Sequence, residues 1–280
     1  MTRLHLSRRT LLGSLGAGLA MTASRGAFAA QTIEAWKKAG EVKIGCEAAY
    51  VPFTYRDNTG KIIGFDVDFA SKMVEPLGVK PVFIDAVWSG IIPALQAGRF
   101  DMVPTMSYTK ERLERVLFSI PYADASQALL IRAADKDKIK GIADLSGKVL
   151  GNKIGSAGET LYARFDAQLK TERGAGFKEH KLYDDHPAAY LALAQGSVDG
   201  VLNTVPTLSV VLRDKPNTFV MIQGVATKNY HGYAFRKEDT ELASFIDSRI
   251  TAMKANGELG ALQDKWFGFR MDLADKIPTF

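Results

Sequence analysis

Apolar segments of two kinds alternate along the chain after residue 40. Short apolar runs typical of buried strands cover residues 42–46, 81–84 and 102–105. Between them, apolar positions recur at helical spacing over residues 65–77 and 91–97. Strands that alternate with helices are typical of an α/β fold, because parallel neighbours need a crossover helix to return the chain. The pattern therefore predicts α/β architecture with a largely parallel sheet.

A ten-residue pattern occurs twice, 98 positions apart. Residues 94–103 read ALQAGRFDMV, and residues 192–201 read ALAQGSVDGV. Each copy predicts a helix that ends at a glycine with left-handed backbone, then a turn into a buried strand. The spacing is too long for a solenoid, whose units run about 20 to 50 residues. We therefore expect two similar α/β lobes.

Two short apolar runs, residues 128–131 and 233–235, suit hinge strands that cross between the lobes. The predicted division places residues 30–127 and 229–280 in lobe 1 and residues 128–228 in lobe 2. Two crossings let a cleft open and close by hinge motion. Since ligands of open α/β sheets bind outside the carboxyl ends of strands, we expect the site where the strand ends of the two lobes face each other.

Residues 1–29 have the features of an export signal. A basic start precedes an apolar stretch over residues 11–21, which is too short to span a bilayer, and AFA at 27–29 is a small-x-small cleavage pattern. The run SRRTLL at 7–12 resembles the twin-arginine export motif. Leu11 stands where phenylalanine is commoner, so a general secretory signal is the alternative. We expect a soluble periplasmic protein.

The net charge of the chain is concentrated in this first segment. The 36 basic and 31 acidic residues give +5, and four arginines with no acidic residue lie in residues 1–29, which leaves 32 against 31 for the rest. A near-neutral remainder gives no reason to expect a nucleic-acid surface. The single cysteine, Cys46, cannot form an intrachain disulfide, and its strand pattern predicts a buried small hydrophobe.

One candidate binding group follows the strand over residues 102–105. Thr109 is a suitable N-cap for the next helix, and Arg112 then lies in its first turn, where the helix dipole disfavours a cation. A bound anion would remove this conflict. The guanidinium fork of Arg112 suits a carboxylate, and Ser107 and nearby backbone N–H groups complete the cradle. The alternative is a solvated arginine paired with Glu111 or Glu114.

The second predicted lobe has a comparable loop over residues 153–160. Ser156 and Glu159 have capping-box spacing, and two glycines allow close approach to the backbone. Many strand-to-helix turns look alike, so the loop is also consistent with a purely structural role. Lys153 either adds positive charge to the site or is a solvated side chain.

Aromatic residues stand near two other strand ends. Tyr50 and Trp88 are placed to enclose the apolar part of a small ligand, with core packing as the alternative. Glu47 closes the first strand, where its carboxylate would meet a ligand cation or remain a surface charge.

The sequence offers little support for catalysis. It contains no Gly-x-Ser-x-Gly elbow and no Walker loop, and its histidines stand apart in polar turns, where we expect surface or capping roles. We therefore expect no metal and no cofactor.

Taken together, these motifs resemble the family 3 bacterial extracellular solute-binding proteins, the periplasmic receptors of polar amino-acid ABC transporters. The resemblance covers essentially all of the chain after residue 29. It implies a two-lobed, type II-like periplasmic-binding-protein fold that closes on its ligand. The motifs are YVPF at 50–53, GFDVD at 64–68, WSGIIPAL at 88–95, GRFD at 98–101, MSYTKER at 106–112, FSIPY at 118–122, LSGK at 145–148 and KWFG at 265–268.

The resemblance also implies roles for individual residues. Arg112 is similar to the arginine that binds the ligand α-carboxylate, assisted by backbone at Ser107 and at Ala157 after Ser156. Tyr50 and Trp88 resemble the two aromatic walls. The remaining positions are Glu47, which in some members meets a cationic ligand side chain, and Thr105, which helps to hold the α-ammonium.

One position departs from the family pattern. Five residues after the repeat Asp199, where the family usually has the aspartate that pairs with the ligand ammonium, this chain has Thr204, preceded by Asn203. A hydroxyl accepts a hydrogen bond but supplies no charge to a desolvated ammonium. A carboxylate ligand without an ordinary α-amine is therefore a second possibility beside an amino acid.

The resemblance implies a monomeric receptor without catalysis that delivers a small carboxylate-bearing ligand, first of all an amino acid, to an ABC permease. The alternative is an enzyme similar to the periplasmic cyclohexadienyl dehydratases, in which an acid in the cleft transfers a proton. Thr204 argues against the enzyme, and Glu47 keeps it open. A ligand sensor that acts through a membrane partner would show the same sequence features.

Overall fold

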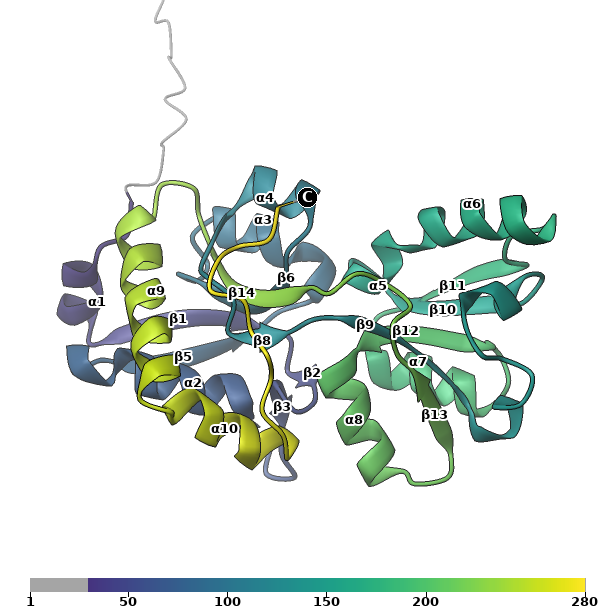
Figure 1. Cartoon of the computed structure of the whole chain (residues 1–280). Coiled ribbons are helices and arrows are strands. Elements are labelled where there is room, and N and C mark those ends of the chain that lie inside the picture. The colour runs from purple at the N-terminus through teal and green to yellow at the C-terminus, as the bar shows by residue number, and fades with distance from the viewer. Residues whose placement is uncertain (1–29, 280) are drawn as a thin grey trace, which may run out of the picture.

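Two α/β lobes stand beside each other in the computed structural model, which describes residues 30–279 (Figure 1). The predicted export signal, residues 1–29, lies outside the described residues. Among residues 30–279, no helix is both long and apolar enough to cross a bilayer.

The first lobe contains both ends of the described chain. Two of its strands pair in parallel, and a bridge between Ile44 and Met102 connects them to the segment that leads into an antiparallel sheet. Its helices are α1 (Ile33–Ala39), α2 (Phe65–Val74), α3 (Ile91–Gln96), α4 (Lys110–Arg115), α9 (Thr240–Ala255) and α10 (Glu258–Phe267). Its strands are β1 (Glu41–Cys46), β2 (Ala49–Tyr50), β3 (Thr54–Arg56), β4 (Ile62–Ile63), β5 (Lys80–Asp85), β6 (Val103–Ser107), β7 (Leu117–Phe118), β8 (Ala123–Asp124) and β14 (Tyr230–Phe235).

The second lobe is built on one five-stranded sheet in the order β11-β10-β12-β9-β13. Its strands are β9 (Gln127–Arg132), β10 (Val149–Lys153), β11 (Glu179–Tyr183), β12 (Gly200–Thr204) and β13 (Phe219–Ile222). Its helices are α5 (Ala157–Thr160), α6 (Tyr162–Arg173), α7 (His186–Ala194) and α8 (Val205–Asp214).

The sheets are more mixed than the sequence pattern predicts. In lobe 2, β9 runs antiparallel to β12 and β13, and in lobe 1, β14 runs antiparallel to β6, β7 and β8. These two strands are the ones that the chain enters from the opposite lobe, without a crossover helix to reverse it. The expectation of a largely parallel sheet holds for the other strands of the lobe 2 sheet, β10 to β13, which run in one direction, and fails at these two strands for this reason.

The segments that connect the lobes lie just before the apolar runs that the sequence indicated. Residues 128–131 and 233–235 pair inside the sheets as parts of β9 and β14. The two connecting segments are hydrogen-bonded to each other: Ala125 N donates to Asn229 O at 2.9 Å, and Asn229 N donates to Ser126 Oγ at 3.4 Å. In the links, Ala125 is fully buried, and the polar Ser126 and Asn229 are half-buried, so the apolar runs mark the buried strands next to the links.

The internal repeat has the same structure in both lobes. Gly98 and Gly196 both have left-handed backbone, with φ of 72° and 77°. Asp101 Oδ2 accepts a hydrogen bond from Lys43 N in β1, at 2.9 Å. Asp199 Oδ2 accepts the corresponding bond from Val149 N at the start of β10, also at 2.9 Å. The repeat therefore fastens each helix-turn-strand unit to a neighbouring strand of its own lobe.

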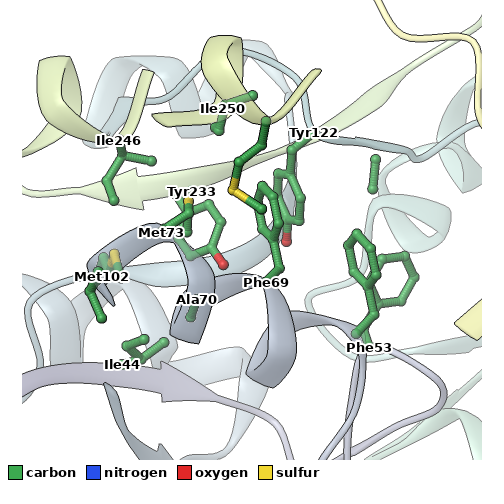
Figure 2. Close-up of a cluster of buried hydrophobic side chains, with 14 of the residues drawn as sticks. Ile44, Phe53, Phe69, Ala70, Met73, Met102, Tyr122, Tyr233, Ile246 and Ile250 are labelled. Atoms are coloured by element: carbon green, nitrogen blue, oxygen red, sulfur yellow. The ribbon is translucent and has the colours of Figure 1, made fainter. Parts of the chain in front are cut away.

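A stack of aromatic rings fills the core of the first lobe. The rings of Phe69 and Tyr122 are nearly parallel, with centroids 5.1 Å apart, and Tyr233 packs against Tyr122 at 4.9 Å (Figure 2). Phe267 at the end of α10 reaches Phe53 in the loop after β2, at 5.1 Å. The KWFG motif thus has the structural role expected of a helix end packed on lobe 1. Phe53 in this loop also stacks on Tyr50 at the end of β2, with centroids 5.3 Å apart, so the core supports Tyr50.

Gly64 lets helix α2 begin directly against this loop. Its φ of 135° belongs to a region that L side chains rarely adopt, and a Cβ there would lie 2.2 Å from Phe53 O. Behind it, Phe65 N donates to Pro52 O and Asp66 N donates to Phe53 O, at 2.9 and 3.0 Å. This close approach fixes Asp66 under the loop.

We expect Gly64→Ala to lower the free energy of unfolding by about 3 kcal/mol or more, because it combines a strained φ with a backbone clash. Gly60→Ala is the matched control: Gly60 also has a positive φ of 83°, but no atom lies within 4 Å of its added Cβ. The control should cost about 1 kcal/mol, which is the left-handed backbone penalty alone. Urea unfolding followed by circular dichroism measures both, and equal costs would contradict the docking argument.

Candidate functional site

A narrow cavity of about 30 Å³ lies where the two lobes meet. This is room for about two water molecules, so a larger ligand enters only when the lobes part. The side chains around it come from strand ends of both lobes, as expected for an open α/β sheet. Of the residues that the sequence singled out, the following line it: Tyr50, Trp88, Thr105, Ser107, Arg112, Ser156, Ala157 and Thr204.

Arg112 is buried in this cavity at 7% exposure, not solvated. Thr109 caps its helix, as predicted, by accepting a hydrogen bond from Arg112 N at 3.2 Å. The guanidinium donates to Ser107 O at 2.9 Å and to Gly155 O of the other lobe at 2.8 Å. Burial lowers the pKa of Arg112 to about 10, so the group is still cationic at neutral pH.

Trp88 and Tyr50, like Arg112, belong to the first lobe and make hydrogen bonds to the second. Trp88 Nε1 donates to Gly155 O at 3.0 Å, so this one carbonyl accepts from both Trp88 and Arg112. The Tyr50 hydroxyl donates to Asn203 Oδ1 at 3.1 Å and lies 3.0 Å from the Thr204 hydroxyl. Both aromatic residues therefore hold polar groups of the second lobe through their N–H or O–H.

Glu47 lies outside the cavity wall but pairs with a residue that is part of it. Its carboxylate accepts a hydrogen bond from Lys153 Nζ, which crosses from the end of β10 in the second lobe. The side chains of Lys153 and Glu47 are 4% and 11% exposed. Burial lowers the pKa of Lys153, and the adjacent Glu47 opposes that shift. Lys153 is thus a buried cation of the site, not a solvated side chain.

Thr105 has a strained backbone, and its hydroxyl already makes a hydrogen bond within the first lobe. Its φ is 55°, uncommon for a β-branched residue, and the pairing of β6 with β14 shifts register nearby. Its Oγ1 donates to Asp66 Oδ2, and Tyr122 OH donates to Asp66 Oδ1 at 2.7 Å. Asp66 is fully buried, and this burial raises its pKa to about 7. The hydroxyl that resembles an ammonium ligand therefore serves a buried carboxyl group.

Two histidines belong to the cavity, although the sequence favoured surface or capping roles for them. His186 and His231 are 5% and 2% exposed and line the cavity beside Gln127. Burial is the main cause that lowers the pKa of His231 to about 3 and that of His186 well below its usual range. Both are neutral at pH 7. The signal that identifies His231 is its place in the apolar run YHGYAF.

Several polar atoms in the wall have no hydrogen-bond partner among the described residues. They are Gln127 Oε1, His231 Nε2 and both ring nitrogens of His186. His231 Nδ1 lies 3.3 Å from Ser107 Oγ, whereas Ser156 Oγ is used to cap α5 by accepting from Glu159 N at 3.1 Å. Within residues 30–279, no three His, Cys, Asp or Glu side chains gather as a metal site. The wall thus combines cations with uncharged donors and acceptors.

Comparison with known proteins identifies this arrangement. The profile of the bacterial extracellular solute-binding proteins, family 3, matches residues 42–269. The chain belongs to this family. It is a solute-binding receptor with the two-lobed fold that the motifs implied.

Two relatives and one solved structure illustrate the family. The L-cystine-binding protein TcyJ of Escherichia coli (strain K12) is 30% identical, over 94% of this chain and 97% of that protein. The L-arginine-binding protein of Pseudomonas aeruginosa is 32% identical, over 81% and 88%. An ancestral amino acid-binding protein, described as a precursor of cyclohexadienyl dehydratase, superposes with a TM-score of 0.76 at 31% identity, covering 85% of this chain and all of that one.

We expect the buried carboxyl group of Asp66 to make stability depend on pH. Its pKa is about 7 in the folded chain and near 4 when unfolded, so the folded state keeps a proton that the unfolded state loses between these values. This contribution to the free energy of unfolding falls as pH rises from about 4 to about 7. Asp66→Asn, which stays neutral, should remove it.

Urea unfolding between pH 4.5 and pH 7.5 tests this expectation. The wild-type value minus the Asp66→Asn value should decrease steadily with pH. Asp57→Asn is the control, because Asp57 is exposed and its hydrogen bond from Thr59 lowers its pKa, so that it titrates below the window. A difference between wild type and Asp66→Asn that stays flat or rises with pH would contradict the assignment.

Proposed function

We propose that this receptor captures a small amino acid between its lobes in the periplasm, closes on it by hinge motion, and delivers it to the permease of an ABC transporter. The observation that carries the proposal is the buried guanidinium of Arg112, held at a cavity between two lobes. The relatives named for L-cystine and L-arginine support an amino acid as the ligand.

The carboxylate end of the ligand is assigned to Arg112. A guanidinium has five N–H donors in a rigid fork, and two of the donors of Arg112 bind Ser107 O and Gly155 O. A carboxylate enters when Gly155 moves away with the second lobe, and the freed donors then bind it as a charge-assisted pair. Ser107 and Ala157 frame this end of the cavity from opposite lobes.

The ammonium end is assigned to uncharged acceptors. The hydroxyls of Thr105 and Thr204 are engaged with Asp66 and with Tyr50, respectively. Gln127 Oε1 and His231 Nε2 have no partner among the described residues, and both residues line the cavity. An ammonium would donate to these two atoms without needing the aspartate that Thr204 replaces. These two acceptors support an α-amino acid as the ligand.

Opening and closing are assigned to the two connecting segments at Ser126 and Asn229. The contacts of Gly155 O, Thr204 and Lys153 with the first lobe all cross the gap, so all of them break when the lobes separate. The lobe boundaries in this proposal are those expected from the sequence, residues 30–127 plus 229–280 and residues 128–228. Export through the segment at 1–29, a monomeric state and the permease belong to the same proposal.

A dehydratase of the same fold is the alternative, suggested by the ancestral precursor. Proton transfer needs an acid or base that is free to reach the substrate. In this chain Glu47 is paired with Lys153, and Asp66 lies behind the Thr105 hydroxyl. Binding without turnover therefore fits the site better. Incubation with prephenate or arogenate tests the alternative by formation of an aromatic product.

A thermal-shift screen of the twenty amino acids and L-cystine tests the proposed function, because a ligand that binds only the native state raises the melting temperature. Their 2-oxo acid analogues test whether the amine is required. If no amino acid produces a shift or a heat of binding by calorimetry, the proposed ligand class is wrong.

For any amino acid that binds, we expect Arg112→Ala to weaken the affinity at least thirtyfold. Loss of one partner of a buried charge pair costs about 2 to 5 kcal/mol, and 2 kcal/mol is about a factor of thirty. Arg115→Ala is the matched control, since Arg115 is on the same helix but is half-exposed and paired with Glu111. Calorimetry measures both variants after circular dichroism shows that they fold. A loss below tenfold for Arg112→Ala would contradict the carboxylate assignment.

A further inference from the structure

The first lobe contains a complete subsite for a cation. Glu47, Tyr50 and Trp88 all belong to this lobe, and they surround one point with a carboxylate and two aromatic rings. Carboxylates and the faces of aromatic rings both attract positive charge, and ring faces do so within about 6 Å. A first lobe on its own would therefore receive a ligand with an ammonium or guanidinium side chain here.

Lys153 occupies this subsite from the second lobe. Its Nζ is paired with Glu47, 4.7 Å from the ring centroid of Trp88 and 5.2 Å from that of Tyr50. Lys153 is the last residue of β10, and its side chain crosses the gap to reach these groups. Closure of the lobes thus inserts the chain's own cation where a ligand cation would bind.

We propose that Lys153 determines ligand specificity by filling the Glu47, Tyr50 and Trp88 subsite, so that the receptor takes amino acids with uncharged or acidic side chains and rejects arginine and lysine. This inference rests on the proposed function as an amino-acid receptor and names the class of amino acid.

The balance of charge around the cavity supports this selection. Arg112 and Lys153 are cations, and both contact the ring of Trp88, with Arg112 Cζ at 5.6 Å from its centroid. Glu47 is the carboxylate that pairs with Lys153, and the neighbouring histidines are neutral. A cationic ligand side chain would add a further positive charge beside Lys153, where Glu47 is the paired carboxylate, because the ligand's own carboxylate is assigned to Arg112. Burial of such an unpaired charge is strongly unfavourable.

Two other carboxylates near the site, among residues 30–279, already have hydrogen-bond partners of their own. Asp185, whose negative charge also raises the pKa of Lys153, caps helix α7 by accepting a hydrogen bond from Ala188 N at 2.8 Å. Asp66 is covered by Thr105 and Tyr122. A ligand cation in the subsite would therefore leave Lys153 desolvated and unpaired on closure, and closure would fail.

Calorimetric titration of wild type and Lys153→Met with L-arginine, L-lysine and L-glutamine tests the inference. Wild type should bind glutamine at least a hundredfold more tightly than arginine or lysine. Lys153→Met keeps a side chain of similar length but removes its positive charge and the repulsion, so it should shift the arginine-to-glutamine affinity ratio by at least a hundredfold towards arginine. Lys153→Arg keeps the cation and should retain the wild-type preference. Equal binding of arginine and glutamine by wild type, or an unchanged ratio in Lys153→Met, overturns the inference.

A second measurement tests the subsite without relying on amino-acid binding. In Lys153→Ala, n-butylammonium replaces the missing side chain and should raise the melting temperature, whereas the uncharged n-butanol should not. The rise should disappear in Lys153→Ala/Glu47→Gln, and Lys181→Ala, which removes an exposed lysine of the same sheet, should show none. If no amino acid binds any variant but n-butylammonium stabilises Lys153→Ala, the proposed function fails and the subsite stands. If n-butylammonium has no effect, the subsite is wrong.

Discussion

Two cationic side chains, Arg112 and Lys153, are held out of water where the lobes meet, and the rest of the site follows from the cost of burying them. A buried charge needs partners, and here each lobe supplies partners to a cation of the other. The second lobe offers the Gly155 carbonyl to Arg112, and the first lobe offers Glu47 and two aromatic faces to Lys153. Both cations lose these partners when the lobes separate. The stability of the closed arrangement therefore depends on the same charged groups that would bind a ligand.

The repeated unit explains how one scaffold presents different chemistry in its two halves. Asp101 and Asp199 make the same backbone bond in their respective lobes, and the strand that follows each of them ends in the cavity wall. The first copy ends in a strained Thr105 above a buried carboxyl group, and the second ends in Asn203 and Thr204, which bind Tyr50. The scaffold is shared, whereas the side chains at the strand ends have diverged.

Local sequence patterns predict the parts of the site that depend on local structure. The helix caps formed by Thr109 and Ser156 could be predicted, because each depends only on the spacing of residues a few positions apart. The internal repeat predicts the two lobes because each copy is a short pattern that can be recognised by itself. The burial of Lys153, the cavity positions of His186 and His231, and the antiparallel β9 and β14 depend on how distant segments meet. No window of the sequence contains both Lys153 and Glu47, which are 106 residues apart, so their pairing is visible only in the folded chain.

The bond from Trp88 Nε1 to Gly155 O also gives the protein an intrinsic optical reporter. The chain contains three tryptophans. Trp36 is buried in α1, and Trp266 donates to Asp68 within the first lobe, so neither indole has a bond that breaks when the lobes separate. Trp88 alone among them bonds across the gap, and it also lies against both cations of the site. Its fluorescence, which responds to nearby charge and to hydration, therefore separates open from closed molecules without any added label.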